Sequence, residues 1–286
     1  MSGKKVRNIL IVCALILIAM IAGIVFTYEP EKHETVKAMM KDAVLHDENR
    51  INFFGIAEVD PSLVSGYIVT AFLLLLALII RIFAIPKFKD VPGRFQMLIE
   101  SWVGIFDGLA KSNSPHRNRA LGAYLFTAGT YIFTGTMFEL FGVQGITTAG
   151  HSISLPAPLA NINGAMSMGI FSYLFILSGG IVANKLAGVG KTLKEFSLPV
   201  SMTFRLFGAL LSGMLTTELV YYYITLSFVL PVIVGVLFTV LHALIQAYVL
   251  TMLTSFYYGE VSEVHEKKPK VKKIKKNKKK EAAEAV

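Results

Sequence analysis

The chain has 286 residues, of which 54% are hydrophobic and 16% are charged, and its mean hydropathy is +0.59. These values exclude an ordinary soluble domain and predict a polytopic membrane protein. Most of the +9 net charge lies in one tail, because residues 265–286 carry ten Lys and three Glu and leave +2 for the other 264 residues. This distribution does not indicate a nucleic-acid-binding face. The single cysteine, Cys13, excludes an internal disulfide framework.

Six stretches are long and apolar enough to cross a membrane, which takes about 20 residues each. They are residues 8–28, 62–80, 120–142, 164–184, 199–229 and 231–258. Lys and Arg gather before the first, between the second and third, between the fourth and fifth, and after the sixth. The positive-inside rule places those segments in the cytoplasm. The acidic loop 29–61 and the uncharged loop 143–163 then lie outside, and both termini lie inside.

The first stretch also resembles a signal peptide, with its basic start and apolar core. No small-x-small cleavage pattern follows that core, which favours an uncleaved helix. We therefore expect three parts: an extra helix with an acidic external loop (1–61), a membrane core (62–258), and a Lys-rich, disordered cytoplasmic tail (259–286). The tail is expected to be a solvated topology anchor, and binding to anionic lipid headgroups is the alternative.

An amphipathic helix is predicted between the second and third spans, over residues 91–108. Gln96, Glu100, Asp107 and Lys111 follow one another at spacings of four, seven and four, so they share one helical face. Apolar residues fill the other face. This pattern is typical of a helix that lies along the membrane surface, here on the cytoplasmic side.

Arg205 is a charge inside an apolar run. Arginine stays protonated at physiological pH, and placing it in the middle of a membrane helix costs about 2.5–3.5 kcal/mol even on the lenient insertion scale. Such a residue is a candidate functional site with a partner to be found. The alternative is an arginine that snorkels from near a helix end.

Other polar residues lie in or beside the predicted spans. Ser212 and Thr216 share the Arg205 face with Gly208 and Ala209, and Thr239, His242 and Gln246 share a face on the last span. These residues are candidates either for the lining of a water-filled path or for contacts between helices. Glu139, Asn161, Asn163 and Glu218 lie near the outer ends of their spans. The positions of these four residues fit either an aqueous vestibule or the simple capping of helix ends at the membrane interface.

Residues 188–192 (GVGKT) end like a phosphate-binding loop, but Lys185 stands where the pattern needs Gly. We expect a cytoplasmic turn there. The sequence contains no metal-ligand spacing and no nucleophile–base arrangement, and no cofactor is implied.

Three segments resemble one family in the right order. Residues 199–208 (PVSMTFRLFG) resemble the Arg-bearing helix of subunit a of F-type ATP synthases, 245–254 (IQAYVLTMLT) resemble its last helix, and 91–96 (VPGRFQ) its cytoplasmic helix. The resemblance implies an all-α membrane protein whose last two helices form a long tilted hairpin. That hairpin packs against a rotating ring of c subunits, with b-type peripheral stalk and other ATP synthase subunits as further partners.

By this resemblance, Arg205 is the fixed cation that each ring carboxylate meets, and Gln246 is its neighbour. Two half-channels carry H⁺ or Na⁺ to and from the ring, in a bacterial plasma membrane, and the subunit is not itself an enzyme. Candidate lining residues are Glu139, Asn161, Asn163, Ser201, Ser212, Thr216, Glu218, Thr239 and His242.

The sequence departs from the family at several usual polar positions. Ala209, Met214, Thr239 and Asn161 stand where the family usually has Asn, a titratable residue, another titratable residue and Asp. We expect Glu218, His242 and Glu139 to substitute for the missing groups.

Two other classes of protein remain open at this point. A stand-alone secondary transporter with an Arg anion site usually shows an internal repeat or paired broken helices, and neither is visible. A membrane scaffold would have no need for Arg205 and Gln246 on adjacent spans.

Overall fold

The computed structural model describes residues 50–53, 57–116, 118–148, 152–222 and 230–263. All of them belong to one compact unit, Met40–Val286. The first predicted span and the Lys-rich tail from residue 264 lie outside the described residues.

The described part is mostly helical, as expected. The helices are α3 (Pro61–Ile79), α4 (Arg94–Asn113), α5 (Asn118–Phe138), α6 (Ile162–Asn184), α7 (Leu186–Lys194), α8 (Ser197–Tyr222) and α9 (Leu230–Ser262). Short π- and 3₁₀-helical turns, η1 (Ile80–Ala84) and η2 (Ile85–Lys87), prolong α3, and η3 (Glu139–Phe141) prolongs α5.

Five of these helices correspond to predicted spans. Three segments are long and apolar enough on their own: Pro61–Lys87, Ile162–Asn184 and Val232–Ser262. Helices α5 and α8 are less apolar because they carry Thr, Gly and, in α8, Arg205. A helix that packs against other helices does not need an apolar surface all round. The count of six spans stays a prediction.

Two short hairpins add strands that the all-α expectation lacked. Strands β1 (Ile51–Phe53) and β2 (Ala57–Val59) pair antiparallel, as do β3 (Gln144–Ile146) and β4 (Ser152–Ser154). The backbone N–H of Thr148 donates to the carbonyl of Arg50 at 2.9 Å and joins the two hairpins. Both hairpins lie in loops that the charge pattern assigns to the outside.

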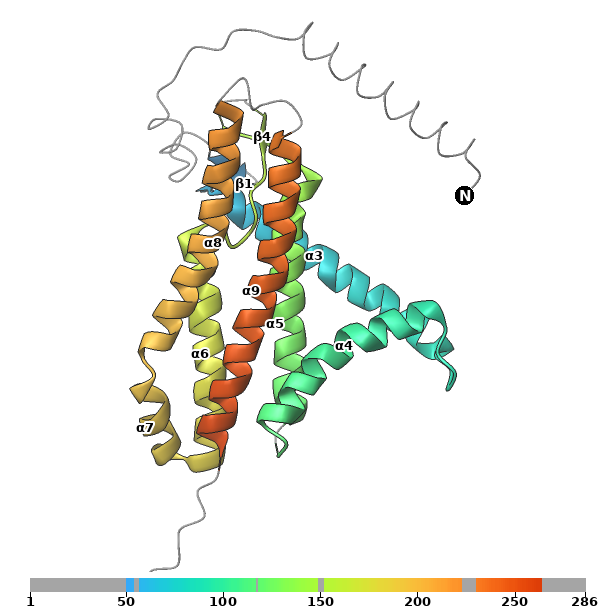
Figure 1. Ribbon diagram of the computed structural model, residues 1–286, viewed down its shortest axis with the longest axis vertical. Helices are drawn as coiled ribbons and strands as arrows, with labels where there is room; N and C mark the ends of the chain where they lie inside the picture. Colours follow the sequence, from blue (N-terminus) through green and yellow to red (C-terminus); the bar gives the residue numbers. More distant parts are fainter. Residues whose placement is uncertain (1–49, 54–56, 117, 149–151, 223–229, 264–286) are drawn as a thin grey trace, which may run out of the picture. The chain divides into compact units, whose positions relative to one another are not determined.

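Helix α9 is the centre of the fold and packs against α5, α6 and α8 (Figure 1). The largest buried cluster draws on all four helices and on the chain before α6. Its members are Ala128, Ile132, Ala157, Leu159, Ala165, Leu206, Leu210, Ala247 and Leu250. At 33 residues α9 is about 50 Å long, which exceeds the roughly 30 Å hydrocarbon core. In a bilayer α9 must therefore tilt or protrude.

Helix α4 has the expected polar face. The Nε2 of Gln96 donates to Glu100 at 2.7 Å, and Lys111 forms an ion pair with Asp107 at 2.6 Å. Phe106 and Ala110 are buried in a cluster with residues of α5 and α9. The amphipathic pattern is confirmed, and its place on the cytoplasmic surface stays a prediction.

The end of α9 is held by side chains from α6 and from the turn between α4 and α5. Asn184 Nδ2 donates to the carbonyls of Val261 and Glu263, both at 2.9 Å. His116 Nε2 lies 3.0 Å from the carbonyl of Ser262. Because these bonds satisfy carbonyls that a helix end leaves free, α9 continues past the predicted start of the tail at residue 259.

The expected turn at residues 188–192 is wrong, because these residues lie in helix α7. Lys185, with φ 51°, ends α6 and reverses the chain, and α7 packs back on α6. Gly188 makes this possible, since a Cβ there would lie 2.0 Å from the carbonyl oxygen of Gly180. Two backbones touch at this crossing, and only glycine fits.

We therefore expect Gly188→Ala to destabilise the protein by about 1–3 kcal/mol, because the added methyl group must push two helices apart. Gly190→Ala, in the same helix, is the matched control, since a Cβ there meets nothing within 4 Å. Alanine is also the better helix former by about 1 kcal/mol. Thermal unfolding of the detergent-solubilised protein compares the two. Equal stability of the two variants would contradict the tight crossing.

Candidate functional site

Arg205 lies on α8 at the border between a buried and an uncovered face. Its neighbours Leu206 and Leu210 are buried in the central cluster. Ser201, Phe204, Gly208 and Ser212 are exposed at spacings of three, four and four, so they form one strip along the helix. Arg205 is half-buried beside this strip. Helix α8 therefore presents a strip of mainly small side chains, with a cation at its edge, to whatever lies outside the chain.

The guanidinium of Arg205 has no partner in the part of the chain that the structure describes, since no hydrogen bond or ion pair there involves it. A half-buried cation without a partner is costly in a membrane. Arg205 is thus a half-buried cation that the described residues leave without a partner.

Gln246 lies on the buried side of α9. Its side chain is 6% exposed, and its Oε1 has no hydrogen-bond partner among the described residues. Ala243, Ala247 and Leu250 share this buried face. An unpaired buried amide oxygen costs about 1–3 kcal/mol. Gln246 is thus a second polar group that the described fold leaves unsatisfied.

The contact between α8 and α9 sets the relative levels of these two residues. A Cβ on Gly213 would lie 3.3 Å from Nδ1 of His242, so these residues face each other. Measured along the helix axis, Arg205 lies about 12 Å before Gly213 on α8, and Gln246 lies about 6 Å after His242 on α9. Because the two helices are antiparallel, both distances run in the same direction. Gln246 and Arg205 therefore differ by about 6 Å in their position along the helix axes. They make no direct hydrogen bond, and both flank the central cluster.

Glu139 and His242 lie at nearly the same height along the axes of the packed helices. A Cβ on Gly129 of α5 would lie 3.1 Å from Cγ2 of Thr251 on α9. Glu139 comes ten residues after Gly129, and His242 comes nine residues before Thr251. Both residues therefore lie at similar distances along the helix axes from this contact. The turn η3, which contains Glu139, packs against α9. Glu139 and His242 are both half-buried, and they approach the same end of the α8–α9 pair from different helices.

Other candidate residues lie along α8 and α9. Ser201 and Ser212 are exposed, whereas Thr216 and Thr239 are half-buried. Thr216 Oγ1 donates to the carbonyl of Ser212 at 2.7 Å, so this hydroxyl is already engaged in its own helix. Glu218 belongs to α8, but its side chain lies outside the described part of the structure.

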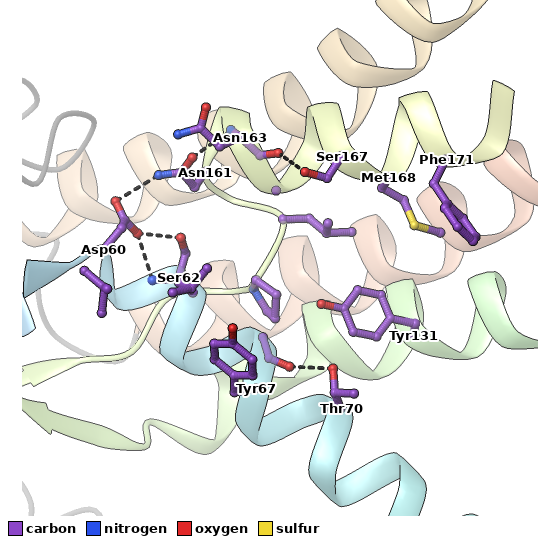
Figure 2. A pocket seen from close by; sticks show the side chains of 16 residues that line it. Asp60, Ser62, Tyr67, Thr70, Tyr131, Asn161, Asn163, Ser167, Met168 and Phe171 are labelled. Atoms are coloured by element: carbon purple, nitrogen blue, oxygen red, sulfur yellow. Dashed lines mark hydrogen bonds between the residues drawn. The ribbon is translucent and has the colours of Figure 1, made fainter. Parts of the chain in front are cut away.

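Asn161 and Asn163 line a separate cleft of about 620 Å³ between α3, α5 and α6 (Figure 2). Among the residues of α6, Gly169 faces α8, since a Cβ there would meet Thr203, and Tyr173 packs with Leu198 and Met202 of α8. Ala165 belongs to the central cluster. On a helical wheel the cleft-lining residues of α6 occupy the other side. Leu159 belongs to both the cleft wall and the central cluster. The cluster thus stands between the cleft and Arg205, and the role of Asn161 and Asn163 in a half-channel stays a prediction.

Asp60 is a cleft residue that sequence reasoning missed. It caps the N-terminus of α3 by accepting from the N–H of Ser62 at 2.8 Å. It also accepts from Asn161 Nδ2 at 2.8 Å, across 101 positions of sequence. An Asp-Pro pair before an apolar run is an N-cap signal, but nothing in the sequence indicates the bond to Asn161. In the described residues, no group of three or more His, Cys, Asp or Glu could hold a metal ion.

Three helices that are long and apolar enough to cross a membrane indicate that this chain is an integral membrane protein. It carries a half-buried arginine on α8 and a buried glutamine on α9. The family model "ATP synthase A chain" matches residues 65–259. ATP synthase subunit a of Cereibacter sphaeroides is 24% identical over 179 residues, which cover 58% of this chain and 69% of that protein. The chain belongs to the ATP synthase A chain family, and it is thus a membrane subunit of the ATP synthase complex that serves ATP synthesis and ion transport.

Proposed function

We propose that this chain is the stator subunit that moves H⁺ or Na⁺ between two half-channels and the carboxylates of the c-subunit ring. The observation that carries the proposal is the half-buried guanidinium of Arg205, which has no partner among the described residues and lies beside the exposed strip of α8. A carboxylate arriving on another subunit satisfies this cation. The b-type peripheral stalk subunits hold the chain still, and both termini face the cytoplasm across the plasma membrane.

The chemistry of arginine suits this task. At 4 Å and an effective dielectric constant of 20, a cation and a carboxylate attract by about 4 kcal/mol. This favours the ionised carboxylate by about a thousandfold, so the ring site releases its ion on meeting Arg205. Each elementary charge that crosses the membrane supplies about 2.3 kcal/mol per 100 mV. A permanent cation also repels ions that would pass directly from one half-channel to the other.

The outer half-channel is proposed to follow Glu139, His242 and Gln246 towards Arg205. Glu139 and His242 stand at one level, and Gln246 lies about 6 Å closer to the level of Arg205. Each group can take part in proton transfer or hydrogen bonding. Thr239 lies one turn further out than His242, and Ser212, Thr216 and Glu218 follow on α8.

The inner half-channel is proposed to pass Ser201. This residue is exposed on the same strip of α8, one turn closer to the cytoplasmic end than Arg205. Ions that leave the ring then emerge near the α7–α8 junction. The long α8–α9 pair, tilted to fit the bilayer, keeps the strip against the ring.

Glu139→Gln is expected to reduce gradient-driven ATP synthesis at least about tenfold, because a carboxamide cannot take up and release a proton. The measurement is the synthesis rate of the reconstituted complex under a fixed imposed gradient. Glu260→Gln is the matched control, since Glu260 is exposed at the opposite end of α9. Equal rates for the two variants would remove Glu139 from the path.

A further inference from the structure

We propose that the cleft between α3, α5 and α6 binds a phospholipid with a primary ammonium headgroup, of the phosphatidylethanolamine class. This site is independent of the ion path, because the central cluster separates it from Arg205. It is therefore a second binding site of the chain, for a lipid of one leaflet.

The cleft is polar at one end and apolar at the other. Asp60, Ser62 and Asn161 gather at the end where α3 and α6 begin, whereas Met168 and Phe171 lie further along α6 (Figure 2). The distance from Asn161 to Phe171 along the helix is about 15 Å. One leaflet contributes half of a hydrocarbon core of about 30 Å. The length of the cleft thus matches the hydrocarbon layer of one leaflet, and its polar end, where α3 and α6 begin, is the end suited to a headgroup.

Asp60 provides the charge that selects the headgroup. In the described residues no cationic side chain pairs with its carboxylate. Three donors reach it: the N–H and hydroxyl of Ser62 and the amide of Asn161. A carboxylate offers about four acceptor sites, so about one remains. An ammonium group with N–H donors fits that site, and a quaternary ammonium group has no N–H to donate.

The start of two helices at the same place suits the lipid phosphate. Helix α3 begins at Pro61 and α6 at Ile162, and the side chains of Asp60 and Asn161, which cap them, are hydrogen-bonded to each other. A helix N-terminus carries about half a positive charge. The polar end therefore combines one negative side chain with two positive helix ends, which complements a zwitterionic headgroup better than an anionic one. In the proposed orientation this lipid belongs to the outer leaflet.

The test uses the intact complex in nanodiscs that contain photoactivatable phosphatidylethanolamine, phosphatidylglycerol or phosphatidylcholine, each in a separate sample. Crosslinks are mapped by peptide mass spectrometry to residues 162–171. We expect labelling by phosphatidylethanolamine to exceed that by the other two at least about fivefold. Asp60→Asn should abolish this preference, because asparagine still caps a helix but lacks the charge. Glu58→Gln, an exposed carboxylate of β2, should keep it.

A second variant tests the acyl end without touching Asp60. Ser167 lines the cleft and is exposed, so Ser167→Phe should fill the space and reduce labelling by all three lipids. Equal labelling of the wild-type complex by the three lipids would overturn the proposal. An unchanged preference in Asp60→Asn would overturn it as well, and so would a wild-type cleft that no lipid labels, because another protein then covers it.

Discussion

ATP synthesis by a complex that carries Arg205→Ala is expected to fall to background, while the complex still assembles. The loss follows from the attraction of about 4 kcal/mol between the guanidinium and an approaching carboxylate, which corresponds to about a thousandfold. Assembly should survive because the Arg205 side chain has no partner among the described residues. The two measurements are the rate of synthesis under an imposed gradient and the amount of intact complex in the detergent extract.

Arg81→Ala is the matched control, because Arg81 is also an arginine next to an apolar helix but is exposed in η1. It should leave synthesis unchanged. Arg205→Lys tests geometry at constant charge, since lysine is a point charge without the planar fork of arginine. We expect it to retain assembly and to lose most of the synthesis.

Gln246→Leu is expected to reduce ATP synthesis about ten- to a hundredfold without loss of stability. The synthesis falls because one hydrogen bond to a charged or transferring group, worth about 1.5–3 kcal/mol, is removed. Stability should stay equal or rise, since leucine replaces a buried amide whose Oε1 is unpaired among the described residues. The measurements are synthesis rate and thermal unfolding of the complex.

The control for Gln246 lies on the same helix. Thr254 of α9 also has a buried hydroxyl without a partner in the described part of the chain. Thr254→Val should raise or preserve stability and leave ATP synthesis intact. Similar losses of synthesis in Gln246→Leu and Thr254→Val would show that α9 tolerates no change of polarity. They would contradict a specific role of Gln246.

Hydropathy and helical periodicity predicted the helices that carry Arg205 and Gln246, because long apolar runs leave few alternatives in a membrane. The exposed strip of α8 was not predicted, because periodicity shows which residues share a face but not whether another helix covers it. The bond between Asp60 and Asn161 was beyond prediction, since it joins residues 101 positions apart and depends on how α3 packs against α5. The levels of Glu139 and His242 depend likewise on helix register, which single contacts such as Gly213 with His242 fix.

Helix α7 was missed for a physical reason. Two glycines and a Lys-Thr pair in residues 188–192 are typical of a turn. The packing of Gly188 on Gly180 outweighs the low helix propensity of glycine, because close backbone contact lets α7 pack along α6. The β3–β4 hairpin was missed because its strands are three residues each, too short for alternation to be visible.

The most direct test of Arg205 follows ATP synthesis and ion flux in the same reconstituted vesicles under one imposed gradient. Wild-type vesicles should synthesise ATP and hold the gradient when ADP is withheld. Vesicles with Arg205→Ala should make no ATP and should lose the gradient whether or not ADP is present, because nothing then blocks direct passage between the half-channels. ATP synthesis at the wild-type rate, or a gradient held as firmly as in wild-type vesicles, would contradict Arg205 as the fixed cation of ion transfer.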